Sequence, residues 1–398
     1  MDQRSVVILS AGLLAWGRNL LGADPSAAPR DTPGVQGRLG HSTGGRTMRA
    51  TKRCRQLLTV VALTVVAASG WPCLGRALGE EASRGAVLSR EEAIKHTLAG
   101  IDKELADHGG SFEKWGESLK SYRAAIKGLS AGKWPWPAKK DFQFQGKEVA
   151  LAMLDTFEGL PLGNLPLQTI LGMDRKLKEQ GVDLIFVPLP DKLAIYPDYF
   201  SDTAPAHRMV TPAIQHLMKK LLESDVEVVD LFPAFYAARA QNEDRPLYYA
   251  TDSHWRNVGA QLAAEHIAQR LRRYDFAQKA LADGNRYSVT PERRQHDRPD
   301  DLLVVLDSKT GGRYADSRDS PILIVGESNL MMNMGAVAGH MPAHIGRHVG
   351  MPLDFGPNKT PSDYYGKLSG KRVVVWATIS RVLVQVGQPQ AGKAGAKK

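Results

Sequence analysis

The chain has 398 residues, of which 43% are hydrophobic and 24% are charged, the composition of a folded globular protein. Its two cysteines exclude a disulfide scaffold and a four-cysteine zinc ribbon. The formal net charge is +10, but the first 79 residues alone hold ten basic and three acidic side chains. The remainder is therefore close to neutral, and nucleic acid is not an expected partner.

The N-terminal part of the sequence has the features of a leader. A basic cluster follows Met48, an uncharged apolar run covers 57–68, and small residues lead to an Ala-x-small pattern. This order predicts a secretory signal peptide, because the apolar run is short for a membrane span. We expect residues 1–47 to be upstream read-through and 48–79 to be the signal peptide, with an uncleaved membrane anchor as the alternative. In both cases the rest of the chain works in the periplasm or outside the cell.

Residues 80–160 are predicted to form a helical N-terminal extension. Residues 90–106 have apolar positions at helical spacing, and this run ends at His108, which two glycines follow. A helical cap on the next domain and a docking surface are both open as roles for this extension.

The segment 161–386 alternates between apolar runs and amphipathic helical patterns. Nearly continuous apolar runs are typical of strands that are buried on both faces of a parallel sheet. We therefore expect an α/β fold with a doubly wound, mainly parallel sheet flanked by helices. The final residues, 387–398, are rich in glycine, alanine and lysine and are expected to be a disordered tail. Strands are predicted over 182–189, 226–232, 321–325 and 372–379, and helices over 169–180, 212–223 and 257–271.

Polar residues follow three of the predicted strands. Asp191 and Lys192 come after the first, Ser328 after the third and Arg381 after the fourth. Ligands bind beyond the carboxyl ends of the strands in an open parallel sheet. These side chains are therefore candidates for a site at one edge of the sheet.

A second group of candidates lies in the loop before residue 257. Asp252 and His254 are two positions apart, so they cannot share a helix face, but they can bond to each other in a tight loop. Nucleophilic acyl transfer needs a serine, a histidine that takes its proton and a carboxylate that orients the histidine. Ser328 completes that set. Leu330 stands where an ordinary α/β-hydrolase has the second glycine of its nucleophile elbow, which disfavours that class.

A metal site is the alternative use of histidine in this sequence. His340, His344 and His348 recur at four-residue spacing, which would align them on a helix. Pro342 and Gly346 are expected to interrupt that helix. We therefore predict no metal ligand set here.

Several segments resemble the periplasmic alginate O-acetyltransferases, which carry an SGNH-hydrolase-like domain. Residues 249–260 read YATDSHWRNVGA and resemble that family's T-D-x-H-W-x-x-x-G-A signature. Residues 187–197 resemble its V-P-x-P-D-K-x-x-I-Y-P segment, and 326–328 stand where the family has G-D-S. Trp376 and Arg381 resemble its late tryptophan-strand-arginine segment, and the order of the motifs agrees.

The resemblance covers about residues 165–385 and implies an SGNH-like catalytic domain over 161–386. In the family the matching residues form the catalytic triad, which here implies Asp252, His254 and Ser328. Further candidates for substrate binding or oxyanion stabilisation are Asn329, Arg381, Asp191, Lys192 and Tyr249. The sequence departs from the family pattern at Glu327, where the family has aspartate, and at Ala377, where an acidic residue is common.

The resemblance implies a serine-dependent O-acetyltransferase that adds acetyl groups to an exopolysaccharide or cell-surface polysaccharide through an acetyl-serine intermediate. The implied partners are the polysaccharide acceptor and a membrane-bound acyltransferase that supplies the acetyl group; no metal or organic cofactor is expected. A carbohydrate acetylesterase with the same triad and an inert polysaccharide-export subunit are the alternatives.

Overall fold

The structure, a computed structural model, describes residues 87–130, 139–160, 164–205, 209–242, 246–284, 286–292, 302–331 and 340–385. These residues all belong to one unit of mutual contacts, Ser83–Lys398. The predicted leader at 1–79 and the predicted tail at 387–398 lie outside the described residues. Within the described part of the chain, no helix has both the length and the apolar character that crossing a membrane requires.

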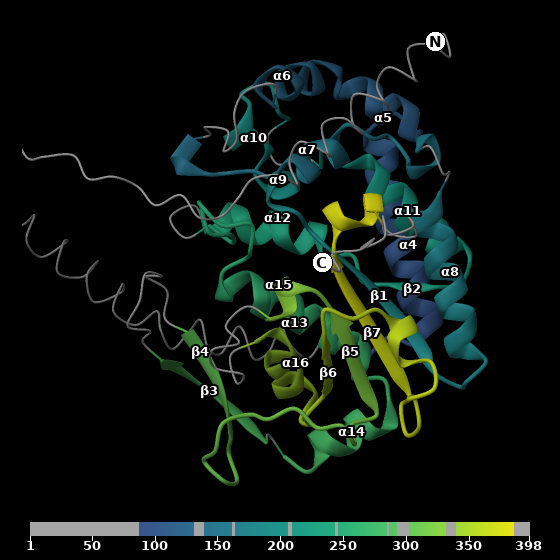
Figure 1. The fold of residues 1–398 in the computed structure, drawn as a ribbon, viewed down its shortest axis with the longest axis vertical. Coiled ribbons are helices and arrows are strands. Elements are labelled where there is room, and N and C mark those ends of the chain that lie inside the picture. The colour runs from purple at the N-terminus through teal and green to yellow at the C-terminus, as the bar shows by residue number, and fades with distance from the viewer. Residues whose placement is uncertain are drawn as a thin grey trace, which may run out of the picture. The chain divides into compact units, whose positions relative to one another are not determined.

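A five-stranded parallel sheet forms the centre of the molecule, with the strand order β2-β1-β7-β5-β6 (Figure 1). Every residue of β5 and β7 is buried, as their uninterrupted apolar runs require. The predicted mainly parallel, helix-flanked sheet is confirmed. The strands of this sheet are β1 (Asp183–Leu189), β2 (Glu227–Val228), β5 (Ile322–Gly326), β6 (Asp354–Pro357) and β7 (Val373–Ile379).

The carboxyl ends of the three central strands lie at one edge of the sheet. Leu189 at the end of β1 is in register with Ile379 at the end of β7, and Gly326 at the end of β5 is in register with Ala377. The segments that leave these strands therefore begin beside one another. This edge is where ligands bind in open parallel sheets.

Helices lie to both sides of the strands in Figure 1. On one side α8 packs against β1 and α11, and α11 also packs against β2; on the other side α13 packs against α16. The helices after residue 160 are α8 (Leu165–Lys178), α9 (Lys192–Ile195), α10 (Pro197–Phe200), α11 (Pro212–Glu223), α12 (Phe232–Gln241), α13 (Asn257–Leu271), α14 (Asp275–Ala282), α15 (Ser328–Met331) and α16 (Met341–Val349).

The described residues of 87–160 are mainly helical, and they pack on the sheet domain. Their longest helix, α4, contacts α11 and β2, while α7 contacts α9 and the 3-10 turn η5 that follows β7. Ser89 caps α4 through a reciprocal pair of hydrogen bonds with Glu92. The helices described here are α4 (Arg90–Asp107), α5 (Phe112–Ser118), α6 (Lys120–Ser130) and α7 (Gly146–Ala152), and the 3-10 turns among the described residues are η1 (Lys139–Asp141), η2 (Phe157–Gly159), η4 (Pro361–Tyr364) and η5 (Ser380–Gln385).

Two features of the fold differ from the sequence-based expectation. The strand predicted over 226–232 is reduced to the two residues of β2, because the backbone turns at Asp230, whose carboxylate accepts a hydrogen bond from the Phe232 N–H where α12 begins. The predicted interruption of α16 is wrong. Pro342 lies in the first turn, where proline is tolerated, and a Cβ on Gly346 would come within 2.6 Å of the Tyr314 ring.

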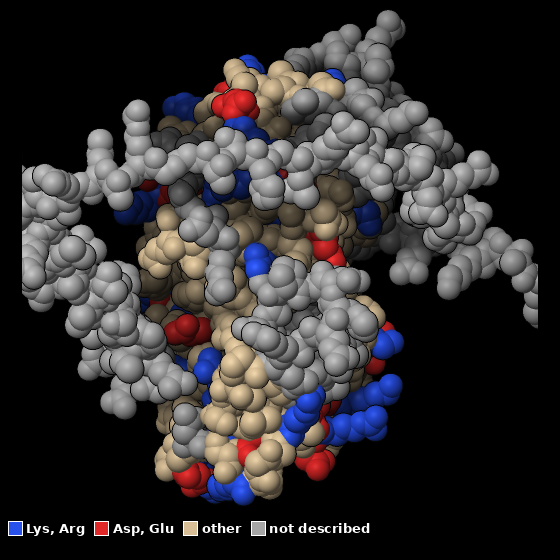
Figure 2. Space-filling view, turned by 90° about the vertical axis from the view of Figure 1, so that its left-hand side faces the viewer, with Lys and Arg blue, Asp and Glu red and all other residues tan. Residues whose placement is uncertain are grey.

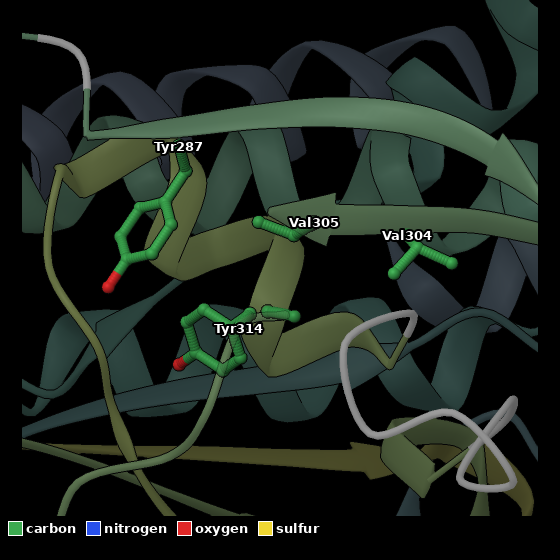
Figure 3. Packing of buried hydrophobic residues seen from close by; sticks show 5 residues of the cluster. Tyr287, Val304, Val305 and Tyr314 are labelled. Carbon is green, nitrogen blue, oxygen red and sulfur yellow. The ribbon is translucent and has the colours of Figure 1, made fainter. Parts of the chain in front are cut away.

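An antiparallel pair of strands, which the sequence did not reveal, lies apart from the main sheet. Strand β3 (Tyr287–Glu292) pairs with β4 (Leu302–Asp307). Tyr287, Val304, Val305 and Tyr314 form its buried apolar cluster with Ala343 of α16 (Figure 3). On the face of the molecule drawn in Figure 2, basic side chains lie next to acidic ones, as the near-neutral charge of the sequence after residue 79 predicts.

Candidate active site

The loop that carries Asp252 and His254 closes on a short antiparallel bridge. Tyr248 pairs with Trp255, and the Tyr249 N–H donates a 3.1 Å hydrogen bond to the His254 carbonyl. Tyr248 and Trp255 are buried, so the base of the loop is anchored in the core. The tip of the loop is thereby presented at the carboxyl edge of the sheet, just before α13.

Asp252 and His254 are bonded to each other within this loop. The Nδ1–H of His254 donates to Oδ1 of Asp252 at 2.5 Å, and the same oxygen accepts a 3.0 Å hydrogen bond from the His254 backbone N–H. The two bonds fix the position of the imidazole ring and its tautomer, which leaves Nε2 as an acceptor. The side chains are 21% exposed for His254 and 27% exposed for Asp252, so solvent and substrate can reach them.

Ser328 reaches the free nitrogen of the imidazole from a different part of the chain. It begins α15, two residues after β5 ends, and its Oγ lies 2.8 Å from Nε2 of His254. The turn into α15 is tight: a Cβ on Gly326 would lie 2.0 Å from the Ala377 carbonyl oxygen. Glycine is therefore required where the strand passes closest to β7. The structure thus brings Asp252, His254 and Ser328 into one hydrogen-bonded chain.

Asn329 lies behind the serine and faces the interior. Its side chain is fully buried, and neither its amide oxygen nor its amide nitrogen has a hydrogen-bond partner in the described part of the chain. Its carbonyl accepts a 3.0 Å hydrogen bond from Nε1 of Trp255. Any contact of Asn329 with a reacting group at the serine would therefore come from the backbone N–H.

Lys192 supports the loop from inside. Its side chain is fully buried, and Nζ donates to the carbonyls of Tyr249, Ala250 and Asp252 at 3.0, 2.9 and 2.8 Å. The ring of Phe142 also faces this ammonium group, at 5.2 Å. Burial lowers the pKa of Lys192 to about 8. The three carbonyls use all three donors of the ammonium group.

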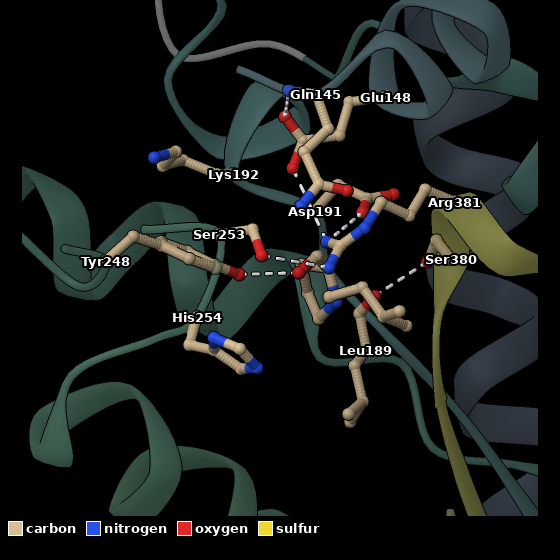
Figure 4. Close-up of polar contacts among 12 residues, drawn as sticks. Gln145, Glu148, Leu189, Asp191, Lys192, Tyr248, Ser253, His254, Ser380 and Arg381 are labelled. Carbon is tan, nitrogen blue, oxygen red and sulfur yellow. Dashed lines mark hydrogen bonds and ion pairs between the residues drawn. The ribbon is translucent and has the colours of Figure 1, made fainter. Parts of the chain in front are cut away.

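Arg381 supports the same loop from another side. Its Nη1 donates to Oδ1 of Asp191 at 3.1 Å, and Nη2 donates to Oγ of Ser253 at 3.3 Å (Figure 4). Asp191 is 1% exposed, and burial raises its pKa to about 8 although Arg381 opposes the shift. Asp191, Lys192 and Arg381 were expected to bind substrate or the oxyanion. All three side chains are buried, and Lys192 and Arg381 donate hydrogen bonds to the loop, while binding of substrate or the oxyanion by these residues stays a prediction.

Glu148 is part of this cluster and was not identified from the sequence. It lies in α7, in the N-terminal extension, and its Oε1 is 3.4 Å from Nη1 of Arg381. Its other oxygen accepts a 3.0 Å hydrogen bond from the Gln145 N–H. The Gln145–Glu148 spacing indicates a helix start, but no local pattern indicates a contact with a residue that follows β7.

Glu327 and Tyr249, both noted in the sequence, also lie near the site. Glu327, which replaces the family's aspartate, accepts hydrogen bonds from Thr378 Oγ1 at 2.8 Å and from the Ile379 N–H. Burial raises the pKa of Glu327. Tyr249 is half-buried, and the Arg256 guanidinium lies 5.9 Å from the centre of its ring. Glu327 therefore joins β5 to β7, while Tyr249 lies at the base of the loop.

The histidines considered as metal ligands have separate surroundings. His340 caps α16 by accepting from the Ala343 N–H and lies 3.2 Å from Asp316 Oδ2. Arg347 Nη2 lies 2.8 Å from Nε2 of His348. Across the described ranges, no group of three His, Cys, Asp or Glu side chains is placed to hold a metal ion.

Comparison with known proteins finds similarity to one family model and to several named relatives. Residues 165–330 match the family model described as the SGNH hydrolase-like domain of acetyltransferase AlgX. The protein named probable alginate O-acetylase AlgJ from Pseudomonas syringae pv. tomato is 28% identical over 118 residues, 30% of this chain and 28% of that protein. Its Pseudomonas aeruginosa counterpart is 23% identical over 103 residues, 26% of this chain and 25% of that protein. The matched region thus spans little more than a quarter of these relatives.

Solved structures with a similar fold include two proteins of the same names. The O-acetyltransferase domain of Pseudomonas putida AlgJ is 19% identical and aligns with a TM-score of 0.41 over 64% of this chain and 91% of that one. Pseudomonas aeruginosa AlgX is 14% identical, with a TM-score of 0.44 over 62% of this chain and 65% of that one. On the sequence matches, residues 165–330 are similar to the SGNH hydrolase-like domain of acetyltransferase AlgX, and part of this chain is similar to the AlgJ proteins.

Proposed function

We propose that this chain is a serine-dependent O-acetyltransferase that adds acetyl groups to an exopolysaccharide or cell-surface polysaccharide, with alginate as the first acceptor to test. The observation that carries the proposal is the hydrogen-bonded chain from Asp252 through His254 to Ser328. The AlgX domain match and the names of the AlgJ relatives support acetyl transfer as the reaction.

The first half of the reaction forms an acetyl-serine. Nε2 of His254 takes the proton of Ser328 as Oγ attacks the acetyl carbonyl carbon of the donor. The bond from that carbon to the donor oxygen breaks, and His254 returns the proton to the leaving oxygen. Asp252 holds the ring and stabilises the imidazolium that forms between the two proton transfers. The bond between Asp252 and Nδ1 supplies that orientation.

The second half transfers the acetyl group to the sugar. A hydroxyl of the polysaccharide gives its proton to His254 and attacks the acetyl carbon, and Ser328 leaves and regains the proton. In both halves the developing oxyanion is held by backbone N–H groups at Ser328 and Asn329, a contribution of about 3 kcal/mol per donor in related acyl transfers. This role suits Asn329, whose side chain is buried.

The proposed setting is the periplasm or the cell exterior, in accordance with the leader that the sequence predicts. Cytoplasmic thioester donors are not expected there, so a membrane-bound acyltransferase is proposed to deliver the acetyl group. The acceptor is a polysaccharide, because the names of the relatives specify alginate O-acetylation. The proposed reaction uses only the side chains and backbone of this chain.

A carbohydrate acetylesterase is the second candidate, with water in place of the sugar hydroxyl. The partial exposure of His254 and Asp252, 21% and 27%, favours it, because water can reach the imidazole. The triad chemistry is otherwise the same, so only the product distinguishes the two activities.

The test uses the full chain and a chromogenic acetyl ester, with Ser328→Ala and Asp252→Asn as variants. We expect Ser328→Ala to abolish turnover and Asp252→Asn to lower kcat by a factor on the order of 10⁴, because the asparagine favours the wrong imidazole tautomer. Ser362→Ala, on the exposed turn η4, is the control and should retain the wild-type rate. If Ser328→Ala turned over the ester at the wild-type rate, the proposal would be wrong.

A further inference from the structure

Glu148 connects the N-terminal extension to the candidate active site. Its side chain is 1% exposed, although it lies in α7, outside the matched segment 165–330. The backbone N–H groups of Gln145 and Lys192 both donate to its carboxylate, and the guanidinium of Arg381 lies 3.4 Å away. One carboxylate therefore contacts the two segments that carry the buried cations of the site.

The side chains of Lys192 and Arg381 both extend to the loop that carries Asp252 and His254. Nζ of Lys192 donates to three carbonyls of that loop, including the carbonyl of Asp252 at 2.8 Å. Nη2 of Arg381 donates a 3.3 Å hydrogen bond to Oγ of Ser253, the residue between Asp252 and His254 in the sequence. The loop is thus contacted from behind by two positive groups, and Figure 4 shows Glu148 and Asp191 beside the guanidinium group of Arg381.

Glu148 is one of the two carboxyl groups that lie beside the guanidinium group of Arg381. Lys192 and Arg381 are both buried, and a buried cation is costly unless a carboxylate or hydrogen-bond acceptors compensate it. Asp191 is the second carboxyl group at Arg381, and burial raises its pKa to about 8. Burial also raises the pKa of Glu148, while Arg381 and Lys192 oppose that shift by attraction.

We propose that Glu148 is a positioning residue for the triad: it holds Lys192 and Arg381 against the loop and so keeps Asp252 and His254 in line with Ser328. The inference rests on the proposed function, because it assumes that the triad is the reacting group. It assigns the N-terminal extension a part in the site rather than a separate docking role. Displacements of about 1 Å in such a site can cost a factor on the order of 10² in rate.

The test is the rate at which phenylmethylsulfonyl fluoride modifies Ser328 in the full chain, measured by peptide mass spectrometry. Glu148→Gln keeps the shape of the side chain and removes its charge. Glu227→Gln is the matched control: Glu227 is also fully buried and paired with an arginine, Arg273, but at the start of β2. Thermal denaturation of both variants reports their stability under the same conditions.

We expect Glu148→Gln to react 10–100-fold more slowly than wild type and Glu227→Gln to react within twofold of wild type, even where the two lose similar stability. The acid limb of the pH–rate profile should also move to lower pH in Glu148→Gln alone, because a displaced Asp252 stabilises the protonated imidazole less. Equal rates for Glu148→Gln and wild type, or equal losses in both variants, would overturn the inference.

A second variant covers the case in which Glu148→Gln does not fold. Ser253→Ala removes only the contact of Arg381 with the loop, from a half-buried side chain. It is expected to slow modification of Ser328 three- to tenfold, and a wild-type rate would then overturn the inference. If Ser328 of the wild-type protein does not react at all, the proposed function itself fails, and this outcome is separate from any effect of Glu148.

Discussion

The indole N–H of Trp255 donates a 3.0 Å hydrogen bond to the backbone carbonyl of Asn329. Each of these residues directly follows a member of the candidate triad, Trp255 after His254 and Asn329 after Ser328. The bond therefore joins the loop that carries the imidazole to the turn that carries the serine. Since the two segments are 74 positions apart in the chain, this contact helps to set the 2.8 Å separation between Nε2 and Oγ.

Trp255→Phe tests that relationship. The phenyl ring keeps most of the buried apolar surface but cannot donate a hydrogen bond, so the carbonyl of Asn329 loses its partner. We expect kcat for an acetyl ester to fall by about tenfold, with KM changed less than twofold, because alignment rather than binding is affected.

Trp115→Phe is the control for that substitution. Trp115 is also fully buried, and its indole N–H donates to a backbone carbonyl, that of Met209, at 3.3 Å. The control should lose a similar amount of stability, about 1 kcal/mol for the hydrogen bond, and retain kcat. Equal effects of both substitutions on kcat would show that the Trp255 bond has no special role at the site.

Lys192→Met removes the ammonium group that holds the loop carbonyls. The substitution removes one donor from each of three carbonyls, of which that of Ala250 keeps the Gln143 N–H, and we expect kcat to fall at least tenfold. Lys371→Met is matched to it, because Lys371 is 7% exposed and donates to the carbonyls of Arg318 and Ser320 away from the candidate triad. Steady-state kinetics on both variants checks the prediction, which is wrong if Lys371→Met lowers kcat as much as Lys192→Met does.

Gly326→Ala tests the close approach between β5 and β7. A Cβ at this position would lie 2.0 Å from the backbone oxygen of Ala377, which cannot move away as a side chain can. We expect the free energy of unfolding to fall by about 3 kcal/mol or more. In Gly172→Ala, a helical position with open space around it, the free energy should rise by about 0.5–1 kcal/mol. Urea denaturation measures both, and a neutral Gly326→Ala would contradict the geometry.

Asp191→Asn tests the buried carboxyl at Arg381. Burial raises the pKa of Asp191 from its ordinary value near 4 to about 8, so the folded protein favours the neutral form. The neutral Asp191 carboxyl group makes its full contribution to the free energy of unfolding below about pH 4, and this contribution is lost as the pH rises to 8. Relative to Asp191→Asn, the wild type should therefore lose up to about 1.4 kcal/mol of unfolding free energy per pH unit over this window.

The opposite sign is expected at Asp307. The Lys309 N–H and the side chain of Arg286 donate to its carboxylate and lower its pKa. Its contribution is present above about pH 4 and lost as the pH falls further. Chemical denaturation of Asp307→Asn and Asp191→Asn across pH 3–9 compares the two slopes. A flat difference between wild type and Asp191→Asn from pH 5 to 8 would show that Asp191 is ionised in the fold.

The parallel strands were predictable because their signal is local. The continuous apolar runs at 182–189 and 372–379 each contain a strand that is buried on both faces, and the structure has β1 and β7 there. Strand β6 was missed because Gly356 and Pro357 within it are typical of turns. Helix α16 was missed because the pattern alone does not show that Pro342 stands in its first turn.

In the candidate site, the meeting of the triad residues was predictable from the sequence, and the contacts of the surrounding buried charges were not. Asp252 and His254 lie in one short motif and Ser328 follows a strand, so sequence order and sheet topology together bring them to one edge. The contact of Glu148 with Arg381 spans 233 positions, and no local pattern encodes it. The direction of the Lys192 side chain depends likewise on tertiary packing, which turns the ammonium group inward to the loop carbonyls.

The central claim is that Ser328 carries the acetyl group on its way to a sugar. The most direct measurement incubates the full chain with an acetyl ester donor and an alginate oligosaccharide, and follows the protein peptides and the oligosaccharide by mass spectrometry. The account predicts an acetylated Ser328 peptide and an acetylated oligosaccharide with the wild type, and neither with Ser328→Ala. Equal acetylation of the sugar by Ser328→Ala, or acetate as the sole product with every polysaccharide acceptor tried, would contradict it.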